Sequence, residues 1–225
     1  MISLTQDMKG YIAYGDEERN WEFKPPFFWG TSSSSAMRRH EIAKTCFAMA
    51  NLEGGGNIII GIKQERSGGR SYARKGLTLK QYKSFDNKDD IARFINPKAN
   101  QKLNIIIHGG LVMIKEEERR FIVIKVQDIK QPFPVISTTH YKSRNKTARI
   151  VHGALYYRTT TTPIETKMIE TQDEWDELLL WLMSHREELT NEQLKKICRS
   201  LRTPITSKGK LLSGKKKSAT RYKTF

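Results

Sequence analysis

Asn51-Leu52-Glu53-Gly54-Gly55-Gly56-Asn57-Ile58-Ile59-Ile60-Gly61-Ile62 is the stretch that decides the fold. It predicts the end of a helix, a glycine turn and a short, very apolar strand, in that order. Residues 58–62 are apolar throughout and β-branched except at Gly61, which is typical of a central strand buried on both faces. The three glycines before it supply positive φ angles or close backbone approach.

A helix from Ala36 to about Leu52, capped by Ser34 or Ser35, is expected to lead into this turn. Its apolar residues, including Ile42, Cys46 and Met49, recur at helical spacing on one face. The order helix, glycines, strand is the reverse of a phosphate-binding loop, which runs strand, glycines, helix. No Gly-Lys-Ser/Thr follows, so the glycine turn is interpreted as structural and gives no physical support for ATP binding.

The chain is strongly basic, with 40 Lys and Arg residues against 24 Asp and Glu residues and a net charge of +16. Residues 202–225 hold eight basic residues and no acidic one, which leaves 40 − 8 = 32 basic and 24 acidic residues, or +8, in the first 201 residues. This charge favours a polyanionic partner, with nucleic acid first and an anionic membrane surface second. A merely soluble basic protein is the plainer alternative.

The two cysteines, Cys46 and Cys198, form neither a disulfide framework nor a zinc-binding spacing, which favours a reducing compartment. The first 14 residues lack the apolar core of a signal peptide. No apolar run approaches the ~20 residues that a membrane span needs. A cytoplasmic protein without a membrane partner is therefore expected.

The remaining pattern predicts a mixed α+β fold, in which helices flank an irregular mixed sheet. Residues 1–170 are expected to form the main domain, 171–202 a pair of helices, and 203–225 a disordered basic tail. The predicted elements are strands over 21–24, 103–108, 111–115, 120–126 and 155–158, and helices over 89–95, 172–188 and 191–201. A polar loop or hairpin tip is expected over 64–83.

Several segments together resemble the Schlafen AlbA_2 domain over roughly residues 14–165. They occur in the family's order and spacing: Glu17, Glu22-Phe23-Lys24, the helix end Ala48-Met49-Ala50-Asn51, Gly54-Gly55-Gly56, Ile59-Ile60-Gly61-Ile62, Ile95-Asn96-Pro97, Phe121–Val126 with Pro134, and Gly153–Arg158 with the threonines that follow. The resemblance implies a nucleic-acid-binding α+β domain. In animal Schlafens the domain occurs twice, in a horseshoe that binds tRNA-like RNA.

Some Schlafens cleave RNA with three carboxylates, and the resemblance implies where these would lie. Glu17 and Glu22 match the first two positions, whereas the third falls on Gln64, with Glu65 beside it. Phosphodiester hydrolysis with Mg²⁺ or Mn²⁺ needs hard oxygen ligands that hold the metal and activate water. Glu17 and Glu22 are the expected metal ligands, Gln64 a neutral third donor and Lys24 a phosphate contact.

Two functions remain open on the sequence alone. The first is an endoribonuclease dependent on Mg²⁺ or Mn²⁺, whose carboxylate triad is incomplete at Gln64. The second is a DNA- or RNA-binding protein without catalysis or cofactor, serving regulation or a defence complex. For Glu17 and Glu22 themselves, an ordinary charged strand face paired with Lys24 or Arg19 is the structural alternative.

Candidate contacts with nucleic acid come from two basic loops and one matching family position: Lys63, Arg66, Arg70, Arg74, Lys142, Arg144 and Arg158. A structural hydrogen bond to a carbonyl is the alternative for Arg158. Phe28 or Trp29 could stack on a base, although a place in the core or a dimer contact is favoured. A homodimer is expected, because one domain supplies half of the two-lobed surface of the larger Schlafens.

Overall fold

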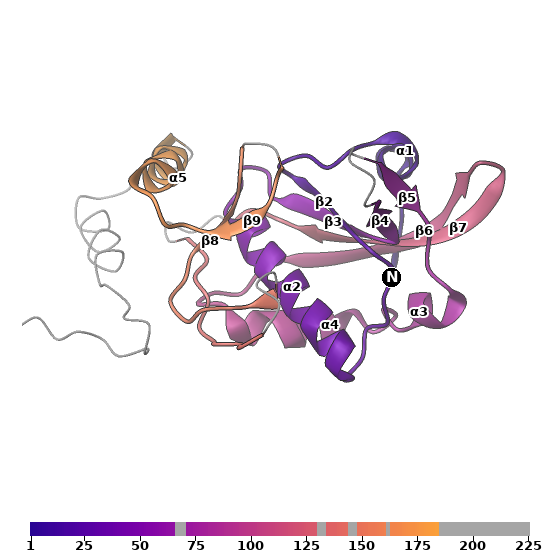
Figure 1. The fold of residues 1–225 in the computed structure, drawn as a ribbon, viewed down its shortest axis with the longest axis horizontal. Coiled ribbons are helices and arrows are strands. Elements are labelled where there is room, and N and C mark those ends of the chain that lie inside the picture. The colour runs from indigo at the N-terminus through magenta and orange to yellow at the C-terminus, as the bar shows by residue number, and fades with distance from the viewer. Residues whose placement is uncertain (66–70, 130–133, 144–147, 161–162, 185–225) are drawn as a thin grey trace, which may run out of the picture. The chain divides into compact units, whose positions relative to one another are not determined.

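The structure is a computed structural model that describes residues 1–65, 71–129, 134–143, 148–160 and 163–184. In chain order its elements are β1 (Ile2–Ser3), α1 (Gln6–Tyr14), β2 (Trp21–Lys24), α2 (Ser33–Ala50), β3 (Gly56–Ile60), β4 (Ile62–Gln64), β5 (Tyr72–Arg74), α3 (Leu79–Lys83), α4 (Lys88–Ile95), a 3₁₀ turn (Asn96–Lys98), β6 (Ile105–Ile114), β7 (Glu117–Val126), β8 (Tyr156–Arg158), β9 (Thr166–Met168) and α5 (Gln172–Ser184) (Figure 1). The predicted helix over 191–201 and the tail lie outside the described residues.

A five-stranded mixed sheet, in the order β1-β6-β7-β3-β2, forms the centre of the fold. β2 runs parallel to β3, and β1 runs parallel to β6, whereas β3–β7 and β6–β7 are antiparallel. β4–β5 and β8–β9 form two separate two-stranded sheets. The predicted α+β class with a mixed sheet is confirmed.

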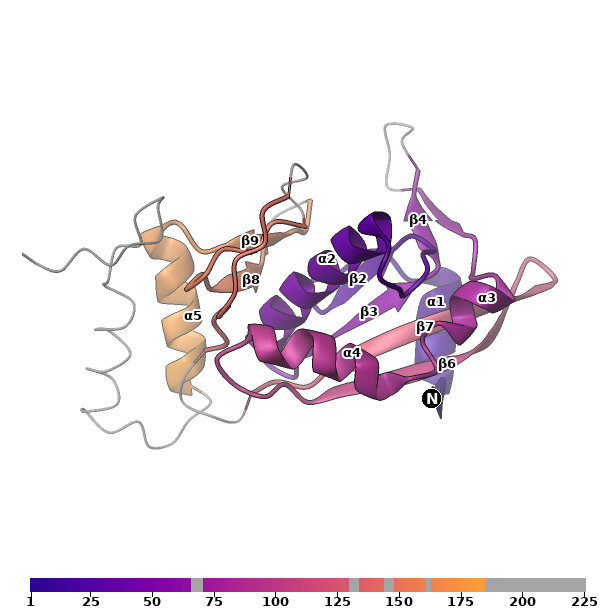
Figure 2. The same ribbon diagram turned by 90° about the horizontal axis from the view of Figure 1, so that it is seen from below.

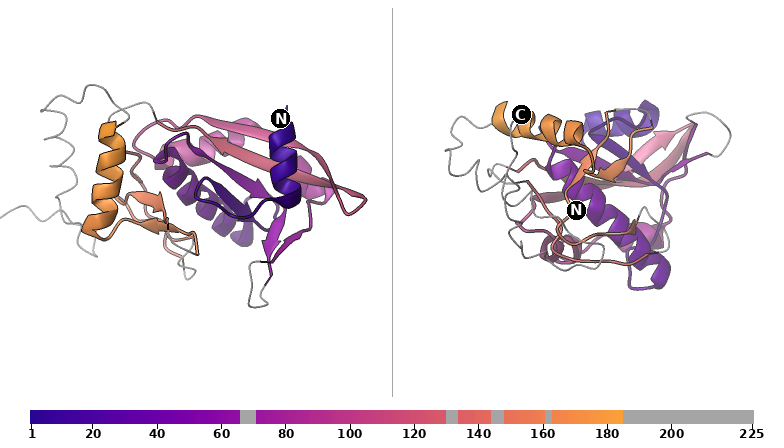
Figure 3. Two further views of the ribbon diagram at one scale, coloured as in Figure 1. Left: turned by 90° about the horizontal axis from the view of Figure 1, so that it is seen from above. Right: turned by 60° about the vertical axis from the view of Figure 1, so that its left-hand side comes forward.

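The central strand β3 is buried on both faces, as its sequence predicts. Ile58 and Ile60 pack into the core beneath α2 and α4, whereas Ile59 points to the other face and packs against Met8 and Ile12 of α1. Figure 2 shows α2 and α4 together on one face of the sheet, and Figure 3 shows α1 on the opposite face. Successive side chains of a strand point to opposite faces, so one unbroken apolar run serves both cores.

The glycine turn between α2 and β3 is structural, and its glycines are required for different reasons. Gly54 and Gly55 have φ angles of +70° and +74°. A Cβ at Gly54 would meet open space, whereas one at Gly55 would lie 2.1 Å from the carbonyl oxygen of Val126. At Gly56 the obstacle is a side chain, because a Cβ there would lie 2.0 Å from the Met49 sulfur.

Several elements differ from those expected. The strand predicted over 58–62 is divided at Gly61, whose φ is +124°, into β3 and β4, and the loop expected over 64–83 contains β5 and α3. The cap of α2 is Ser32, which accepts a hydrogen bond from the Ser35 backbone at 3.3 Å, so the helix begins earlier than predicted. The two strands expected on either side of Gly109-Gly110 are one continuous strand, β6. These glycines lie opposite Ile122 and Phe121 in the ladder, and they permit close approach of neighbouring side chains rather than a turn.

Helix α5 packs on the small β8–β9 sheet. Leu178 is buried with Leu155, Tyr157 and Ile169, and Trp175 packs against the same cluster. The helix is described as far as Ser184, so its predicted end at Glu188 lies outside the described residues.

Candidate functional site

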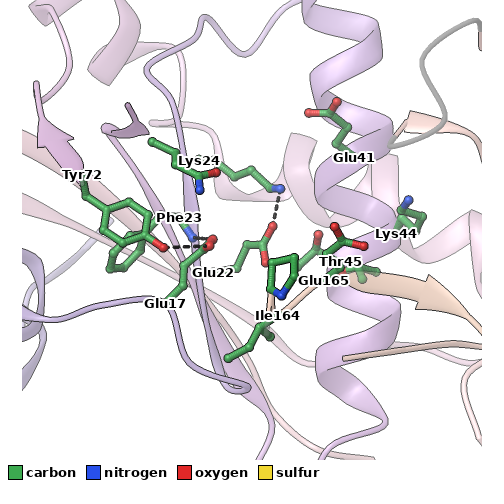
Figure 4. A pocket seen from close by; sticks show the side chains of 13 residues that line it. Glu17, Glu22, Phe23, Lys24, Glu41, Lys44, Thr45, Tyr72, Ile164 and Glu165 are labelled. Atoms are coloured by element: carbon green, nitrogen blue, oxygen red, sulfur yellow. Dashed lines mark hydrogen bonds and ion pairs between the residues drawn. The ribbon is translucent and has the colours of Figure 1, made fainter. Parts of the chain in front are cut away.

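A pocket of about 340 Å³ brings together the four residues that the sequence predicts as catalytic (Figure 4). It lies between the edge strand β2, helix α2, the β4–β5 hairpin and the segment 163–166. Its lining comprises Glu17, Glu22, Phe23, Lys24, Glu41, Lys44, Thr45, Gln64, Tyr72, Pro163, Ile164, Glu165 and Thr166. Glu41, Lys44 and Glu165 were not predicted as site residues.

Alternation along β2 places its charged residues in the pocket. Phe23 points into the core with α1, so Glu22 and Lys24 point to the opposite face, toward α2. The sequence pattern indicated a charged face of this strand. The structure shows that this face is covered, since Glu22 is only 6% exposed.

Glu22 is the counter-ion of Arg158, which is fully buried. The Arg158 Nη1 donates to one oxygen of Glu22, while Nε donates to the carbonyl of Arg19 at 3.2 Å and Nη2 to that of Glu18 at 3.2 Å. Burial lowers the pKa of Arg158 to about 10, against the attraction of Glu17 and Glu165, so it stays charged at neutral pH. These contacts are the hydrogen bonds to carbonyls that the structural alternative for Arg158 predicts, and a fully buried guanidinium favours that alternative over a contact with nucleic acid.

The other oxygen of Glu22 pairs with Lys24, whose side chain reaches across the pocket in Figure 4. Burial lowers the pKa of Lys24, although Glu41 and Glu17 oppose that shift. Both oxygens of Glu22 therefore accept hydrogen bonds from cations.

Glu17 is held at the pocket wall by two donors. Its Oε1 accepts a hydrogen bond from the Phe23 backbone at 2.8 Å, and its Oε2 accepts one from the Tyr72 hydroxyl at 3.3 Å. The side chain thus ties the loop before β2 to strand β5.

Lys44 is a second pocket lysine, and it is 8% exposed. Burial lowers its pKa to about 8; repulsion from Lys24 adds to the shift, whereas Glu41 and Glu165 oppose it. Glu41 accepts a hydrogen bond from Arg38 at 2.6 Å. The spacing of Glu41 and Lys44 on the predicted helix places them on one face, but only tertiary structure shows that this face meets β2.

A family model described as Schlafen, AlbA_2 matches residues 17–166, which include the pocket and Arg158. The chain belongs to the Schlafen AlbA_2 family. Family membership supports a nucleic-acid-related role for the protein.

The other comparisons add little to this Schlafen AlbA_2 assignment. No curated protein matches the chain. The DIP2311 protein from Corynebacterium diphtheriae is a similar solved structure, with 17% identity and a TM-score of 0.38. The match covers 70% of this chain and 23% of that one, so the chain spans about a quarter of its length. At that score the likeness carries no structural argument.

The donor set of this Schlafen AlbA_2 pocket does not fit Mg²⁺ or Mn²⁺ as it stands. Magnesium takes near-octahedral oxygen coordination, usually with carboxylates whose lone pairs are available. Glu22 is already neutralised by Arg158 and Lys24, and both oxygens of Glu17 accept hydrogen bonds. Within the described ranges, no group of three or more His, Cys, Asp or Glu residues is placed to hold a metal ion.

Gln64, the residue at the third carboxylate position, lines the pocket and is exposed. Its neighbour Glu65 does not line the pocket and accepts a hydrogen bond from Ser71 at 2.8 Å. Glu65 therefore does not replace the missing acid.

The basic residues predicted to contact nucleic acid in this Schlafen AlbA_2 protein differ in their exposure and hydrogen bonding. Lys63 and Lys142 are exposed. Each of the three guanidinium nitrogens of Arg74 donates to a backbone carbonyl, including that of Ile12 at 2.6 Å, which fits a structural role better than a nucleic-acid contact. Arg66, Arg70 and Arg144 lie outside the described residues.

The aromatic residues before α2 also differ in position. Trp29 is buried and packs against Phe27, Phe85 and Phe94, in agreement with the favoured core interpretation. Phe28 is 43% exposed. Of the helices that the structure describes, none has both the length and the apolar character required to cross a membrane.

Proposed function

We propose that this protein binds nucleic acid without metal-dependent cleavage at the Glu17–Glu22 pocket. The observation that carries the proposal is the Glu22–Arg158 pair. A metal ion at Glu22 would have to compete with a guanidinium that has no access to solvent. Removing the partner of a buried charge is strongly unfavourable. Glu22 therefore stabilises the fold as the counter-ion of Arg158, and binding a metal would require it to give up that role.

Family and charge support nucleic acid as the ligand. The net charge of +16 attracts a polyanion, and the first 201 residues alone carry +8, so the positive charge is not confined to the tail. RNA and DNA share the phosphate backbone that this charge recognises. Competition between RNA and DNA of the same sequence is the measurement that separates them.

A metal-dependent endoribonuclease is the second candidate function, because four residues from three separate segments converge in one pocket. Glu17, Glu22, Lys24 and Gln64 all line it, beside a lysine whose pKa is lowered. Titratable groups with shifted pKa values cluster at catalytic sites. For this function Lys24 would have to leave Glu22, and Gln64 would have to supply a neutral oxygen.

A binding and cleavage panel distinguishes the two functions. The full-length protein is incubated with tRNA, single-stranded DNA and duplex DNA, each with Mg²⁺, with Mn²⁺ or with EDTA. Our proposal expects binding in all three conditions and no metal-dependent products. Glu17→Gln tests the pocket, because it removes a charge and keeps the side-chain shape, and Glu65→Gln is the matched control outside it.

Cleavage that requires metal and disappears in Glu17→Gln, but not in Glu65→Gln, would establish the nuclease instead. Absence of binding to every nucleic acid at low salt would remove both functions. The predicted homodimer belongs to the same proposal, and light scattering at tens of micromolar protein, on the order of the dissociation constant of a weak dimer, measures it.

A further inference from the structure

Helix α2 and the 3₁₀ turn after α4 carry basic residues outside the pocket that the proposed function does not use. We define the α2–α4 cation cluster as the cations Arg39 and Lys98 together with the imidazole of His40, all of which surround the ring of Phe94. The Arg39 guanidinium carbon lies 3.8 Å from the ring centroid, and the Lys98 Nζ lies 3.7 Å from it. His40 meets the same ring edge to face, at 5.1 Å between centroids.

Among the described residues, neither Arg39 nor Lys98 forms an ion pair with an acidic side chain. Asp90 is the acid that attracts Arg39 electrostatically, but its carboxylate already accepts a hydrogen bond from Arg93 at 2.7 Å. Burial lowers the pKa of Lys98, and repulsion from Arg39 adds to that shift. Burial also lowers the pKa of His40, so its imidazole is mainly neutral at neutral pH.

The polar contacts of the cluster are also incomplete. Arg39 donates from Nη1 to the carbonyl of Gly30 at 3.0 Å, and Lys98 donates to that of Phe94 at 2.6 Å. The Nε of Arg39 is buried and has no hydrogen-bond partner among the described residues. Two half-buried cations that donate only to carbonyl oxygens can still donate to a stronger, charged acceptor.

The cluster continues onto a segment that the sequence already marked as basic. The Tyr141 ring stacks on His40 with centroids 3.5 Å apart and planes 2° apart. The next residue, Lys142, is exposed and is one of the predicted nucleic-acid contacts. The stacking of Tyr141 on His40 thereby holds the backbone next to Lys142 against α2, although the two segments are distant in sequence.

We infer that the α2–α4 cation cluster, with Lys142 beside it, binds backbone phosphates of nucleic acid. The chemistry is that of a phosphate oxygen accepting charge-assisted hydrogen bonds from Arg39 and Lys98. This rests on the proposed function for the identity of the ligand. It adds a second contact surface that is independent of the Glu17–Glu22 pocket.

Salt-dependent binding of a labelled single-stranded oligonucleotide tests the inference. The variants are Lys98→Gln and Arg39→Gln, alone and together, with Lys98→Arg as the variant that retains charge. Lys115→Gln is the matched control, because it removes one unit of charge from the exposed turn between β6 and β7. For each lost contact we expect the log–log salt slope to become shallower by about 0.7. For the double variant we expect affinity to fall on the order of tenfold.

The outcomes separate this inference from the proposed function. Normal binding by the wild type, with unchanged affinity and slope in the double variant, would overturn the phosphate contact and leave nucleic-acid binding intact. That result, together with a lower melting temperature, would assign the cations to packing on Phe94 alone. Lack of binding by the wild type would overturn both.

Photo-crosslinking of the wild-type protein covers the case in which the variants fail to fold. An oligonucleotide containing 5-bromouracil is bound, irradiated and digested, and the attached peptides are identified by mass spectrometry. Crosslinks to peptides that contain His40, Phe94 or Tyr141 support the inference. Crosslinks confined to other parts of the chain contradict it.

Discussion

Glu22 and Arg158 lie 136 residues apart in the sequence and form one buried ion pair. The pair explains why spacing alone gave an incomplete view of Glu22. Its position in a Glu-x₄-Glu-Phe-Lys segment points to metal chemistry, whereas its surroundings make it the counter-ion of a guanidinium. The same carboxylate therefore contributes first to stability, which affects how any catalytic variant at this position is interpreted.

Glu22→Ala is expected to lower the free energy of unfolding by about 3–5 kcal/mol, because it leaves the buried Arg158 charge without a partner. Urea denaturation followed by circular dichroism measures the change. Glu65→Ala is the control, and as an exposed residue it should stay within about 0.5 kcal/mol of the wild type. An effect of similar size at both positions would contradict the account of Glu22.

Lys44 gives a prediction about pH. Its folded-state pKa is about 8, below its ordinary value, so the unfolded chain holds this proton more tightly. Below pH 8 the charged amine therefore destabilises the fold by its full amount, and this penalty disappears as the pH rises toward the ordinary lysine pKa. Lys44→Met should consequently be more stable than the wild type at pH 7.

The stability gain of Lys44→Met over the wild type should shrink between pH 8 and about pH 10. Parallel urea titrations of both proteins across this range measure it, with Lys115→Met as an exposed control. A gain that does not change with pH would mean that the effect comes from packing rather than from the buried charge.

At the scale of elements, the turn between α2 and β3 shows two different reasons for glycine: a positive φ angle and a lack of space for a Cβ. Gly54→Ala should cost about 1–2 kcal/mol, because its positive φ is unfavourable but the space around it is open. Gly55→Ala should cost about 3 kcal/mol or more, because its Cβ would also collide with the backbone of Val126.

Thermal and urea unfolding of the two alanine variants measures this difference. Gly54→Asn is a useful companion, since asparagine adopts the left-handed conformation more readily and should recover part of the loss. Equal costs for Gly54→Ala and Gly55→Ala would indicate that the turn relaxes around the added atom.

The elements also show where sequence reasoning succeeds. The run Ile58–Ile60 predicts a strand buried on both faces, because a residue buried in either direction must be apolar. Gly109-Gly110 misled the strand assignment, since glycine marks turns and close contacts alike. A Cβ at Gly109 would meet the Tyr82 hydroxyl, and one at Gly110 would meet the Leu4 side chain. Tyr82 and Leu4 are distant in sequence, so no local pattern shows that these glycines permit close contact rather than a turn.

In the pocket, too, some residues could be predicted from the sequence and others could not. Glu17, Glu22 and Lys24 are close in sequence, so their proximity could be predicted from spacing and family resemblance. Glu41 and Lys44 come from α2, and Glu165 follows β8. Their arrival at β2 depends on packing between distant segments. The α2–α4 cation cluster was not predicted for the same reason.

For the whole molecule, the distribution of positive charge predicts how nucleic-acid binding depends on salt concentration. Of the eight basic residues in 202–225, all but Arg202 are removed by deleting residues 203–225, a loss of 8 − 1 = 7. We expect the logarithm of the binding constant to fall steeply with the logarithm of salt concentration, and the slope to become shallower after the deletion. Fluorescence polarisation at several salt concentrations measures both slopes.

Replacement of the same segment by an uncharged Gly-Ser sequence is the control for chain length. It should behave like the deletion, because the expected effect depends on charge. If both proteins keep the wild-type slope, the tail makes no phosphate contacts and the main domain supplies the whole electrostatic attraction.

The contacts of Arg158 also bear on how the chain can be divided. Its guanidinium donates to the carbonyl groups of Glu18 and Arg19, just before β2, and of Trp21 at the start of β2. β2 is an edge strand, beyond which the described structure has no further strand of the sheet. Exposed strand edges recruit other chains. A fragment, a protease product or a nascent chain that stops before residue 158 would leave these carbonyl groups without the Arg158 donor, and Glu22 would keep only Lys24 as a counter-ion among the described residues. Arg158 thus covers part of the edge that would otherwise be open to pairing with another chain.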